Sequence, residues 1–264
     1  MMRTLIIKGL EAEGSSVNLE TQLLAPALNA VVEVWYLGVY DNLNPGSGGT
    51  VIDGGASVGD FTLKASKWVG NEGLVVAVEP NPDNLALLKR NLLKNQISNV
   101  VVVNKALSDC EGAIDFNGRT VETVSLDRLS RDLGIHRIDS IKLDIEGAEE
   151  KAILGGADAV RNAVHISMET HSPELYQRIC NTLAMKGYRV YSPSFRSLVT
   201  KMSLRLLSNP FPFVFAEASR MTSWNLTKGP LLWGMGRWFY ENRKPDMFSP
   251  QRHLAILAAD RVDG

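Results

Sequence analysis

The sequence predicts an α/β fold, with helices on both faces of a mostly parallel sheet. From residue 50 onward, short apolar runs typical of buried strands alternate with segments of helical periodicity. Several of these runs end in glycine or acidic residues, as the strands of such sheets do at their ligand-binding edge. With 264 residues, 45% of them hydrophobic and 22% charged, the chain is long enough for one large domain of this class.

Residues 1–47 precede this alternation, and we expect them to form a helical lead-in to a domain at 48–264. Apolar side chains recur at helical spacing within residues 18–42, namely Leu23, Leu24, Leu28, Val31, Val32 and Trp35. The loop NLNPGSGG at 42–49 ends the lead-in. The apolar run at Leu5–Ile7 is too short for a secretory signal. Two cysteines make no disulfide framework, so the composition favours a cytoplasmic protein.

The elements follow in order along the chain. Gly70 closes one predicted helical segment. The pair Asn81–Pro82 begins another, and Leu85, Leu88 and Leu92 mark one face of that helix. The predicted helices are Asp60–Val69, a helix beginning at Pro82, Leu126–Leu133, Ala148–Leu154 and Pro173–Lys186. The predicted strands are Thr50–Asp53, Leu74–Val78, Asn99–Val103, Ala113–Phe116 (a short extra strand), Ser140–Ile145, Val164–Thr170, Tyr188–Tyr191 and His253–Ala258.

The stretch VIDGGASVGDFT after the first of these strands is a candidate ligand site. A strand, a small-residue turn and a helix N-terminus let a polar ligand approach the backbone, because glycine has no Cβ. The turn Gly54-Gly55-Ala56-Ser57-Val58-Gly59 matches the dinucleotide fingerprint imperfectly. Asp53 before it would repel a pyrophosphate and suits the ammonium and sulfonium of S-adenosylmethionine. The alternative is a tight turn with no ligand.

Glu79 ends the next strand, in VVAVEPNPDN. An acid at this place accepts hydrogen bonds from the ribose hydroxyls of an adenosine. The alternative is a solvated loop acid. The turn and Glu79 together are more specific than either feature alone.

A third cluster is IKLDIEGAEE at 141–150. Strand alternation would send Lys142, Asp144 and Glu146 to one side, and charges at the end of a buried strand indicate a site. Asp144 would face the reacting end of the cofactor. The alternatives are that Glu146 caps the next helix and that Asp144 pairs with Lys142.

The strand at 164–170 ends in Glu169, and His171 follows it. A histidine here could take a proton from a substrate hydroxyl, because its pKa lies near neutral pH. A satisfied structural histidine is the alternative. The spacing of Asp144, Glu169 and His171 matches no strong metal motif, so we predict no metal.

Taken in order, VIDGGASVGDFT, VVAVEPNPDNLALLKRNL, VNKALSD, VSLDRL and IKLDIEGAEEKAILGG resemble the FkbM-type S-adenosylmethionine-dependent methyltransferases. The resemblance covers roughly residues 48–192 and the final strand. It implies a class I methyltransferase (Rossmann-like) sheet of seven mostly parallel strands, with the last strand antiparallel. It also implies O-methylation, often of a sugar or natural-product hydroxyl.

By matching positions, the resemblance also implies roles for individual residues. The residues that the resemblance implies to hold the methionine part of S-adenosylmethionine are Asp53, Gly55, Ala56, Ser57 and Gly59. Glu79 would bind the ribose, with Pro80 and Asn81 beside it, and Ala106 would lie near the adenine. Asp144 and Glu146 of the D-x-E-G motif would stand beside the transferred methyl. One departure is Ser57, where the family often has Asn.

Residues 195–250 exceed a minimal methyltransferase. They hold more than half of the chain's aromatic residues and more basic than acidic side chains. We expect an insertion between the last two strands, with three open interpretations: a lid over an acceptor pocket, a membrane-surface element peripheral to the bilayer, or a dimerisation arm of a homodimer. A local satellite core is the fourth.

The acceptor is therefore expected to be a small molecule, a glycan or a lipid-linked compound. A net charge of −1 provides no general attraction for nucleic acid, although an RNA methyltransferase stays an alternative. The alternative from another class is a non-catalytic cofactor-binding partner subunit.

Overall fold

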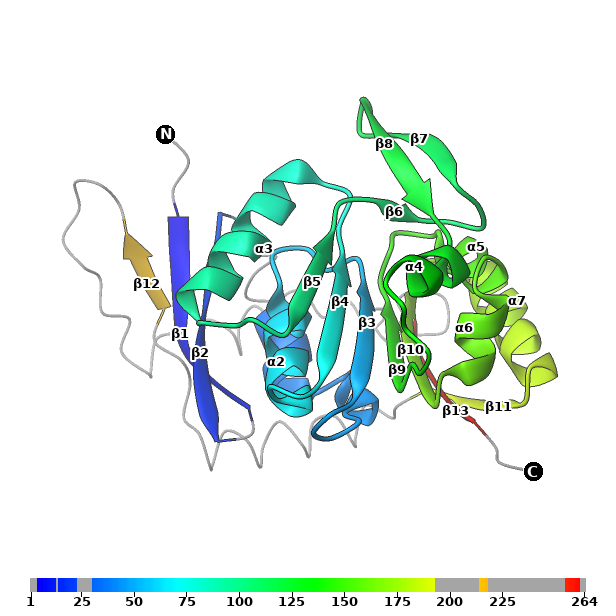
Figure 1. The fold of residues 1–264 in the computed structure, drawn as a ribbon, viewed down its shortest axis with the longest axis horizontal. Coiled ribbons are helices and arrows are strands. Elements are labelled where there is room, and N and C mark those ends of the chain that lie inside the picture. Colours follow the sequence, from blue (N-terminus) through cyan, green and yellow to red (C-terminus); the bar gives the residue numbers. More distant parts are fainter. Residues whose placement is uncertain (1–3, 13, 23–29, 193–213, 218–254, 262–264) are drawn as a thin grey trace.

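The computed structural model describes residues 4–12, 14–22, 30–192, 214–217 and 255–261. Within these ranges the main sheet has seven strands in the order β11-β13-β10-β9-β3-β4-β5, and β13 alone runs antiparallel (Figure 1). The strands are β3 Thr50–Gly54, β4 Leu74–Val78, β5 Val100–Val103, β9 Ser140–Leu143, β10 His165–Thr170, β11 Tyr188–Tyr191 and β13 Ala255–Arg261. The predicted α/β fold with an antiparallel last strand is confirmed.

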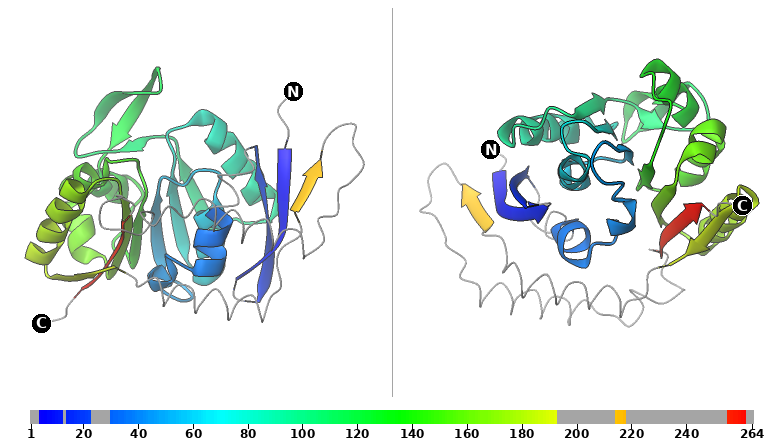
Figure 2. Two further views of the ribbon diagram at one scale, coloured as in Figure 1. Left: turned by 180° about the vertical axis from the view of Figure 1, so that it is seen from behind. Right: turned by 60° about the horizontal axis from the view of Figure 1, so that its bottom comes forward.

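Neighbouring residues of the central strands face two different cores. Val51 of β3 packs with the helices on one face of the sheet, whereas Ile52 packs with those on the other, and both are fully buried. One face carries η1 (Val31–Leu37), α2 (Asp60–Val69) and α3 (Pro82–Lys94), and the other α4 (Leu126–Asp132), α5 (Glu149–Leu154), α6 (Ala157–Asn162) and α7 (Pro173–Met185) (Figure 2). Burial on both faces explains the continuous apolar runs of the sequence.

The predicted helices are confirmed to within one or two residues at their ends. Asn81 is the N-cap of α3, and its side chain accepts a hydrogen bond from the backbone of Asp83 at 2.9 Å. The sequence analysis did not predict α6, which has only six residues. The predicted strand Ser140–Ile145 is shorter than expected, because β9 ends at Leu143 and the backbone then turns.

The expected helical lead-in is wrong for residues 4–21, which form the hairpin β1 (Thr4–Ala12) and β2 (Ser15–Thr21). In β2 the buried Val17 and Leu19 alternate with the exposed Ser16 and Asn18, and this period of two is that of a strand. Helical backbone in the described part of the lead-in is confined to η1 and to the short η2 (Asp41–Leu43).

Two asparagine side chains of α3 join the hairpin to the sheet domain. Asn91 accepts a hydrogen bond from the backbone N–H of Glu20 at 2.7 Å and donates to its carbonyl at 2.9 Å. One helical turn later, Asn95 makes the same pair of bonds with Asn18, both at 2.7 Å. The carboxylate of Glu20 also pairs with Arg90 and Lys94. These side chains therefore satisfy the outer edge of β2.

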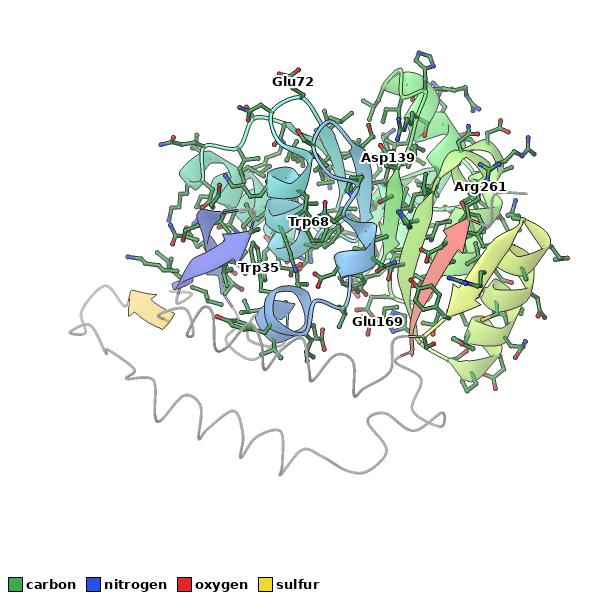
Figure 3. All side chains as sticks on the ribbon, turned by 90° about the horizontal axis from the view of Figure 1, so that it is seen from below. Trp35, Trp68, Glu72, Asp139, Glu169 and Arg261 are labelled. Carbon is green, nitrogen blue, oxygen red and sulfur yellow. The ribbon has the colours of Figure 1, made fainter. Side chains whose placement is uncertain are left out.

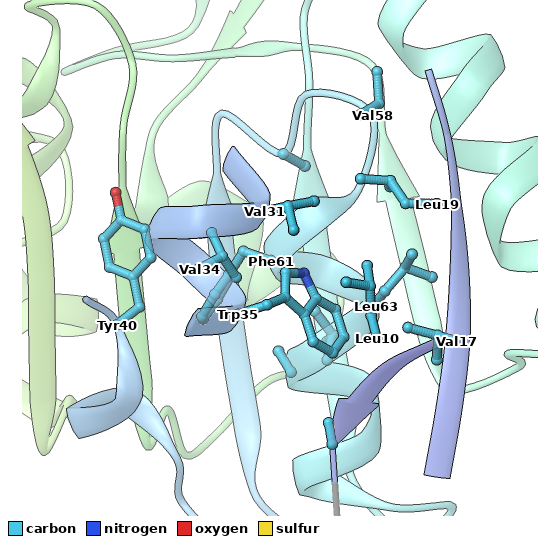
Figure 4. Close-up of a cluster of buried hydrophobic side chains, with 14 of the residues drawn as sticks. Leu10, Val17, Leu19, Val31, Val34, Trp35, Tyr40, Val58, Phe61 and Leu63 are labelled. Atoms are coloured by element: carbon cyan, nitrogen blue, oxygen red, sulfur yellow. The ribbon is translucent and has the colours of Figure 1, made fainter. Parts of the chain in front are cut away.

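Apolar side chains of the hairpin and of α2 meet around Trp35 of η1 (Figure 4). Leu10 and Val17 come from the hairpin, and Phe61 and Leu63 come from α2. This cluster fixes η1 against the sheet domain. It thereby fixes Tyr40, which follows η1 and is 5% exposed.

Two small sheets complete the described structure. β12 (Val214–Glu217), which lies in the expected insertion, pairs antiparallel with β1, far from β11 and β13 in Figure 1. The rest of the insertion lies outside the described residues. Its four interpretations, as a lid, a membrane-surface element, a dimerisation arm or a satellite core, therefore stay open. The other sheet joins β6 (Ala106–Leu107), β7 (Gly112–Phe116) and β8 (Arg119–Val124). β7 confirms the predicted short strand, and β8 was not predicted.

Candidate active site

A row of residues crosses the carboxyl edge of the sheet, one position beyond the last residues that pair between the parallel strands β4, β3, β9 and β10. Val78, Gly54, Leu143 and Met168 are paired in register across four adjacent strands. The residues that follow them are Glu79, Gly55, Asp144 and Glu169. We call these four the edge row. In a parallel sheet this edge is where ligands bind.

A second polar row lies one position deeper. Asp53 of β3 is paired in register with Lys142 of β9, and Lys142 with Ser167 of β10. The three residues are 0%, 2% and 0% exposed. Their strand neighbours pack toward α4–α7, so this row faces the side of η1 and α2.

Lys142 lies one position deeper in the sheet than the edge row, and its side chain contacts the end of β3. Its Nζ lies 3.2 Å from Oδ1 of Asp53 and donates to the carbonyl of Gly55 at 2.9 Å. It also lies 5.7 Å from the ring centroid of Tyr40. Burial lowers the pKa of Lys142, but the carboxylates of Asp53, Asp144 and Asp60 outweigh it and raise the pKa above its ordinary value. Lys142 is thus a buried cation.

Asp53 is held on its other oxygen by α2. Thr62 donates to Oδ2 of Asp53 at 2.5 Å. Asp53 therefore sits between a strand neighbour and a helix, with its carboxylate fixed in position. The predicted acid before the glycine turn is buried and belongs to the same cluster as Lys142.

Contacts within the protein explain the glycines of the turn. Gly55 has φ +73°, and a Cβ there would lie 1.9 Å from the carbonyl oxygen of Asp144. Gly59 has φ +94°, and a Cβ there would lie 2.6 Å from the side chain of Leu88 on α3. The turn after β3 is thus pressed against both β9 and α3. Within the turn, Ser57 also has a positive φ of +50°, and Ala56 is buried.

Glu79 links β4 to this turn. Its carboxylate accepts hydrogen bonds from the backbone N–H of Ser57 at 2.7 Å and of Asn81 at 2.8 Å. The side chain is 4% exposed, and burial raises its pKa against the opposing effect of these bonds. The two features that the sequence analysis combined therefore lie in direct contact. Pro80 and Asn81 follow Glu79, and Ala106 is buried in β6.

The D-x-E-G loop after β9 is closed by Glu149. This fully buried carboxylate accepts hydrogen bonds from the backbone of Ile145 at 3.0 Å and Gly147 at 3.2 Å. Glu146 between them is exposed and has φ +55°, an uncommon backbone conformation for a residue with a side chain. Glu146 does not cap α5, whose N-cap is Ala148.

His171 contacts Glu149, the residue that accepts the hydrogen bonds of this loop. Its Nε2 lies 3.4 Å from Oε1 of Glu149. The Glu149 carboxylate raises the pKa of His171 to about 9, so the imidazole is protonated at neutral pH. A protonated imidazole has no free lone pair to accept a proton. The expected role of His171 as a base stays a prediction, and its pairing with Glu149 weighs against that role.

Four carboxyl groups surround Tyr40 and influence one another; we call them the acidic rim, and they are Glu33, Asp60, Asp144 and Glu169. Glu33 is exposed, but the protein atoms packed around it and the carboxylates of Asp144 and Asp60 raise its pKa to about 7. Burial, with Asp53 and Asp144, raises the pKa of Asp60 to about 6. Burial, Asp144 and Glu33 raise that of Glu169 to about 8. The site holds more acids than nearby cations can balance.

The structure thus brings Asp53, the glycine turn, Glu79 and Asp144 together. It sets Glu146 on the exposed side of its loop and pairs His171 with Glu149.

Sequence reasoning missed Glu33, Tyr40 and Glu149. Glu33 and Tyr40 precede the motifs in the chain, and only the packing of η1 brings them to the site. Among the described residues, no group of three or more His, Cys, Asp or Glu side chains could hold a metal ion.

The arrangement is that of a class I methyltransferase. A solved structure agrees on the fold: "Precorrin-6y C5,15-methyltransferase" from Geobacter metallireducens GS-15 superposes with a TM-score of 0.50 at 14% identity, over 92% of this chain and 93% of that one. An S-adenosylmethionine-dependent O-methyltransferase from Thermotoga maritima gives a TM-score of 0.43 at 14% identity, over 92% of this chain and 68% of that one.

The sequence comparison is more specific. The family described as "Methyltransferase FkbM domain" matches residues 53–190, more than half of the chain. The protein is therefore a member of the FkbM methyltransferase family, and the resemblance found in the sequence is confirmed. The family's description makes the matched segment, residues 53–190, a methyltransferase domain.

A curated relative comes from Sulfurisphaera tokodaii. It is described as "Probable cobalt-precorrin-6B C(15)-methyltransferase (decarboxylating)" and is 26% identical over 142 residues, which are 54% of this chain. The match spans 64% of that protein's length.

Among the described residues, no helix is both long and apolar enough to cross a bilayer.

Proposed function

We propose that this protein binds S-adenosylmethionine along the edge row and transfers its methyl group to a hydroxyl of a small molecule or glycan. The observation that carries the proposal is the Glu79 carboxylate, fixed at the end of β4 against the turn that follows β3. Glu79 would hold the ribose, and Asp53, Gly55 and Asp144 would border the methionine part. The bound donor supplies a methyl group already activated on sulfur.

The charge of the site fits this donor. The raised pKa values of Glu33, Asp60 and Glu169 arise in part from mutual repulsion among the rim acids. A ligand carrying an ammonium and a sulfonium relieves that repulsion, whereas a pyrophosphate adds to it. This supports S-adenosylmethionine over a nicotinamide dinucleotide.

The same charge distinguishes among acceptors. Phosphate or carboxylate groups near the rim would be repelled, which disfavours RNA and favours uncharged hydroxyl acceptors. The partners we propose are therefore neutral small molecules, glycans or lipid-linked compounds. Detection of S-adenosylhomocysteine as a product separates an enzyme from a non-catalytic cofactor-binding subunit.

Removing the charge of Glu79 is expected to weaken donor binding by about 10- to 100-fold, because charged hydrogen bonds contribute about 1.5–3 kcal/mol. The measurement is calorimetric titration of S-adenosylmethionine into the native chain and into Glu79→Gln. Glu122→Gln is the matched control, since that carboxylate lies on β8 with 73% of its side chain exposed. Equal binding by Glu79→Gln and the native chain would contradict the ribose contact, and absence of binding to the folded native chain would overturn the proposed function.

Donor affinity is expected to increase about tenfold between pH 6 and pH 7.5. At pH 6 the rim carboxyls with pKa values of about 7 and 8, Glu33 and Glu169, are mostly protonated. As the pH rises they ionise and attract the cationic donor, so binding releases protons. Titrations at both pH values, each in two buffers of different ionisation enthalpy, measure this release. An affinity that stays constant or decreases with pH would contradict the role of the rim.

A further inference from the structure

The position of Glu169 in the edge row places it beyond the donor. Across the sheet the row runs from Glu79 on the β4 side, through Gly55 and Asp144, to Glu169 on the β10 side. If Glu79 holds the ribose, the donor's methionine part lies over β3 and β9. Glu169 then stands on the side where the methyl group leaves and the acceptor enters.

The side chain of Glu169 faces the same side of the sheet as the buried Asp53–Lys142 row. Met168 packs toward α4–α7, so its neighbour Glu169 points toward η1 and Tyr40. Figure 3 labels Glu169 at the end of β10. Asp144 directly follows the end of β9, whose last residue Leu143 is paired in register with Met168.

Glu169 also differs in its partners from the other buried and half-buried acids of the site. Glu79 and Glu149 each accept two backbone hydrogen bonds, and Asp53 accepts one from Thr62. Among the residues that the structure describes, the half-buried Glu169 carboxyl has neither a hydrogen bond nor an ion pair. A half-buried carboxyl without a partner is unfavourable for folding, and such groups persist where a ligand completes them.

We propose that Glu169 faces the transferred methyl group and is the base that takes the proton of the acceptor hydroxyl. This inference rests on the proposed function. The acceptor O–H bond breaks and its proton goes to the Glu169 carboxylate. The freed electron pair of the oxygen forms the bond to the methyl carbon, and the pair of the broken carbon–sulfur bond stays on sulfur, which leaves S-adenosylhomocysteine.

The surroundings suit this role. The pKa of Glu169 is raised to about 8 by burial and by the carboxylates of Asp144 and Glu33. The positive charges of His171 and Lys142 act in the opposite direction and lower this pKa. A base with a pKa near the working pH is efficient in proton transfer. The His171–Glu149 pair has a different part: it holds the D-x-E-G loop, and with it Asp144, in position.

The test uses two analogues and needs no knowledge of the acceptor. In sinefungin a carbon bearing an amino group replaces the sulfonium and its methyl, so a positive charge lies where the methyl group would be. S-adenosylhomocysteine has neutral sulfur there. The native protein is expected to bind sinefungin at least about tenfold more tightly than S-adenosylhomocysteine, through attraction between ammonium and carboxylate.

In Glu169→Gln this preference is expected to fall by about tenfold, while S-adenosylhomocysteine binds as it does to the native chain. Glu122→Gln, at an exposed carboxyl on β8, is the comparison variant and is expected to keep the preference. A native chain without the preference, or a Glu169→Gln variant that retains it, overturns the assignment of Glu169. Failure of the native chain to bind any of the analogues or the donor overturns the proposed function instead.

Turnover adds an independent readout. With the fastest acceptor from a panel of uncharged sugar and phenol hydroxyls, Glu169→Gln is expected to lower kcat by about 10²- to 10⁴-fold with little change in the KM for the donor. The native rate is expected to rise with pH up to about 8, and the variant is expected to lose this dependence. A rate profile unchanged in Glu169→Gln would contradict the base.

Discussion

Replacing Lys142 with Met is expected to destabilise the protein by about 3–5 kcal/mol, one of the largest effects open to a single substitution. The change leaves the fully buried Asp53 without its cationic neighbour and the Gly55 carbonyl without its donor. Urea denaturation of the native and variant chains measures the difference in the free energy of unfolding.

Two controls accompany this measurement. Lys105→Met breaks an exposed ion pair with Glu122, of 3.0 Å, and is expected to change stability by about 0.5 kcal/mol or less. The double variant Lys142→Met with Asp53→Asn removes the stranded charge and is expected to recover part of the loss. A Lys142→Met variant as stable as Lys105→Met would show that the buried pair contributes nothing.

Gly55→Ala is expected to destabilise the protein by about 3–5 kcal/mol, from a left-handed backbone and from steric overlap. The added Cβ would lie 1.9 Å from the backbone oxygen of Asp144, and neither backbone segment can move without disturbing the sheet. We expect donor binding to be lost as well, because the turn would be displaced from Glu79 and Asp144. Denaturation and calorimetry together measure both effects.

Gly187→Ala separates the two causes. Gly187 also has a left-handed backbone, with φ +87°, but a Cβ there would meet nothing within 4 Å. Its replacement is expected to destabilise by about 1–2 kcal/mol and to leave donor binding unchanged. If both variants lost the same stability, the close approach of the turn to β9 would have no energetic importance.

The sequence allowed the central sheet and the acids at its edge to be predicted, for a physical reason. Strands buried on both faces must be apolar throughout, so polar residues such as Glu79 and Asp144 stand out where each strand ends. The resemblance to the family then implied seven strands with the last one antiparallel. Both inferences depend on local sequence, which a single chain displays directly.

Features that depend on distant packing could not be predicted. Glu33 and Tyr40 reach the site only because Trp35 anchors η1 against α2 and the hairpin. Glu149 is one of two adjacent acids, and only the turned backbone at Glu146 explains its burial. One local signal was overlooked: Asn117 and Gly118, both with positive φ, form the two-residue turn between β7 and β8.

The strand order also affects when the protein can finish folding. Among the described strands, β11 pairs with β13 alone, and β1 accepts β12, so segments made early wait for segments synthesised much later. By contrast, β3, β4, β5, β9 and β10 can pair as soon as residue 170 is available. We expect the emerging chain to acquire its donor-binding edge first and to hold open strand edges until the late segments arrive, an interval in which aggregation is the main risk.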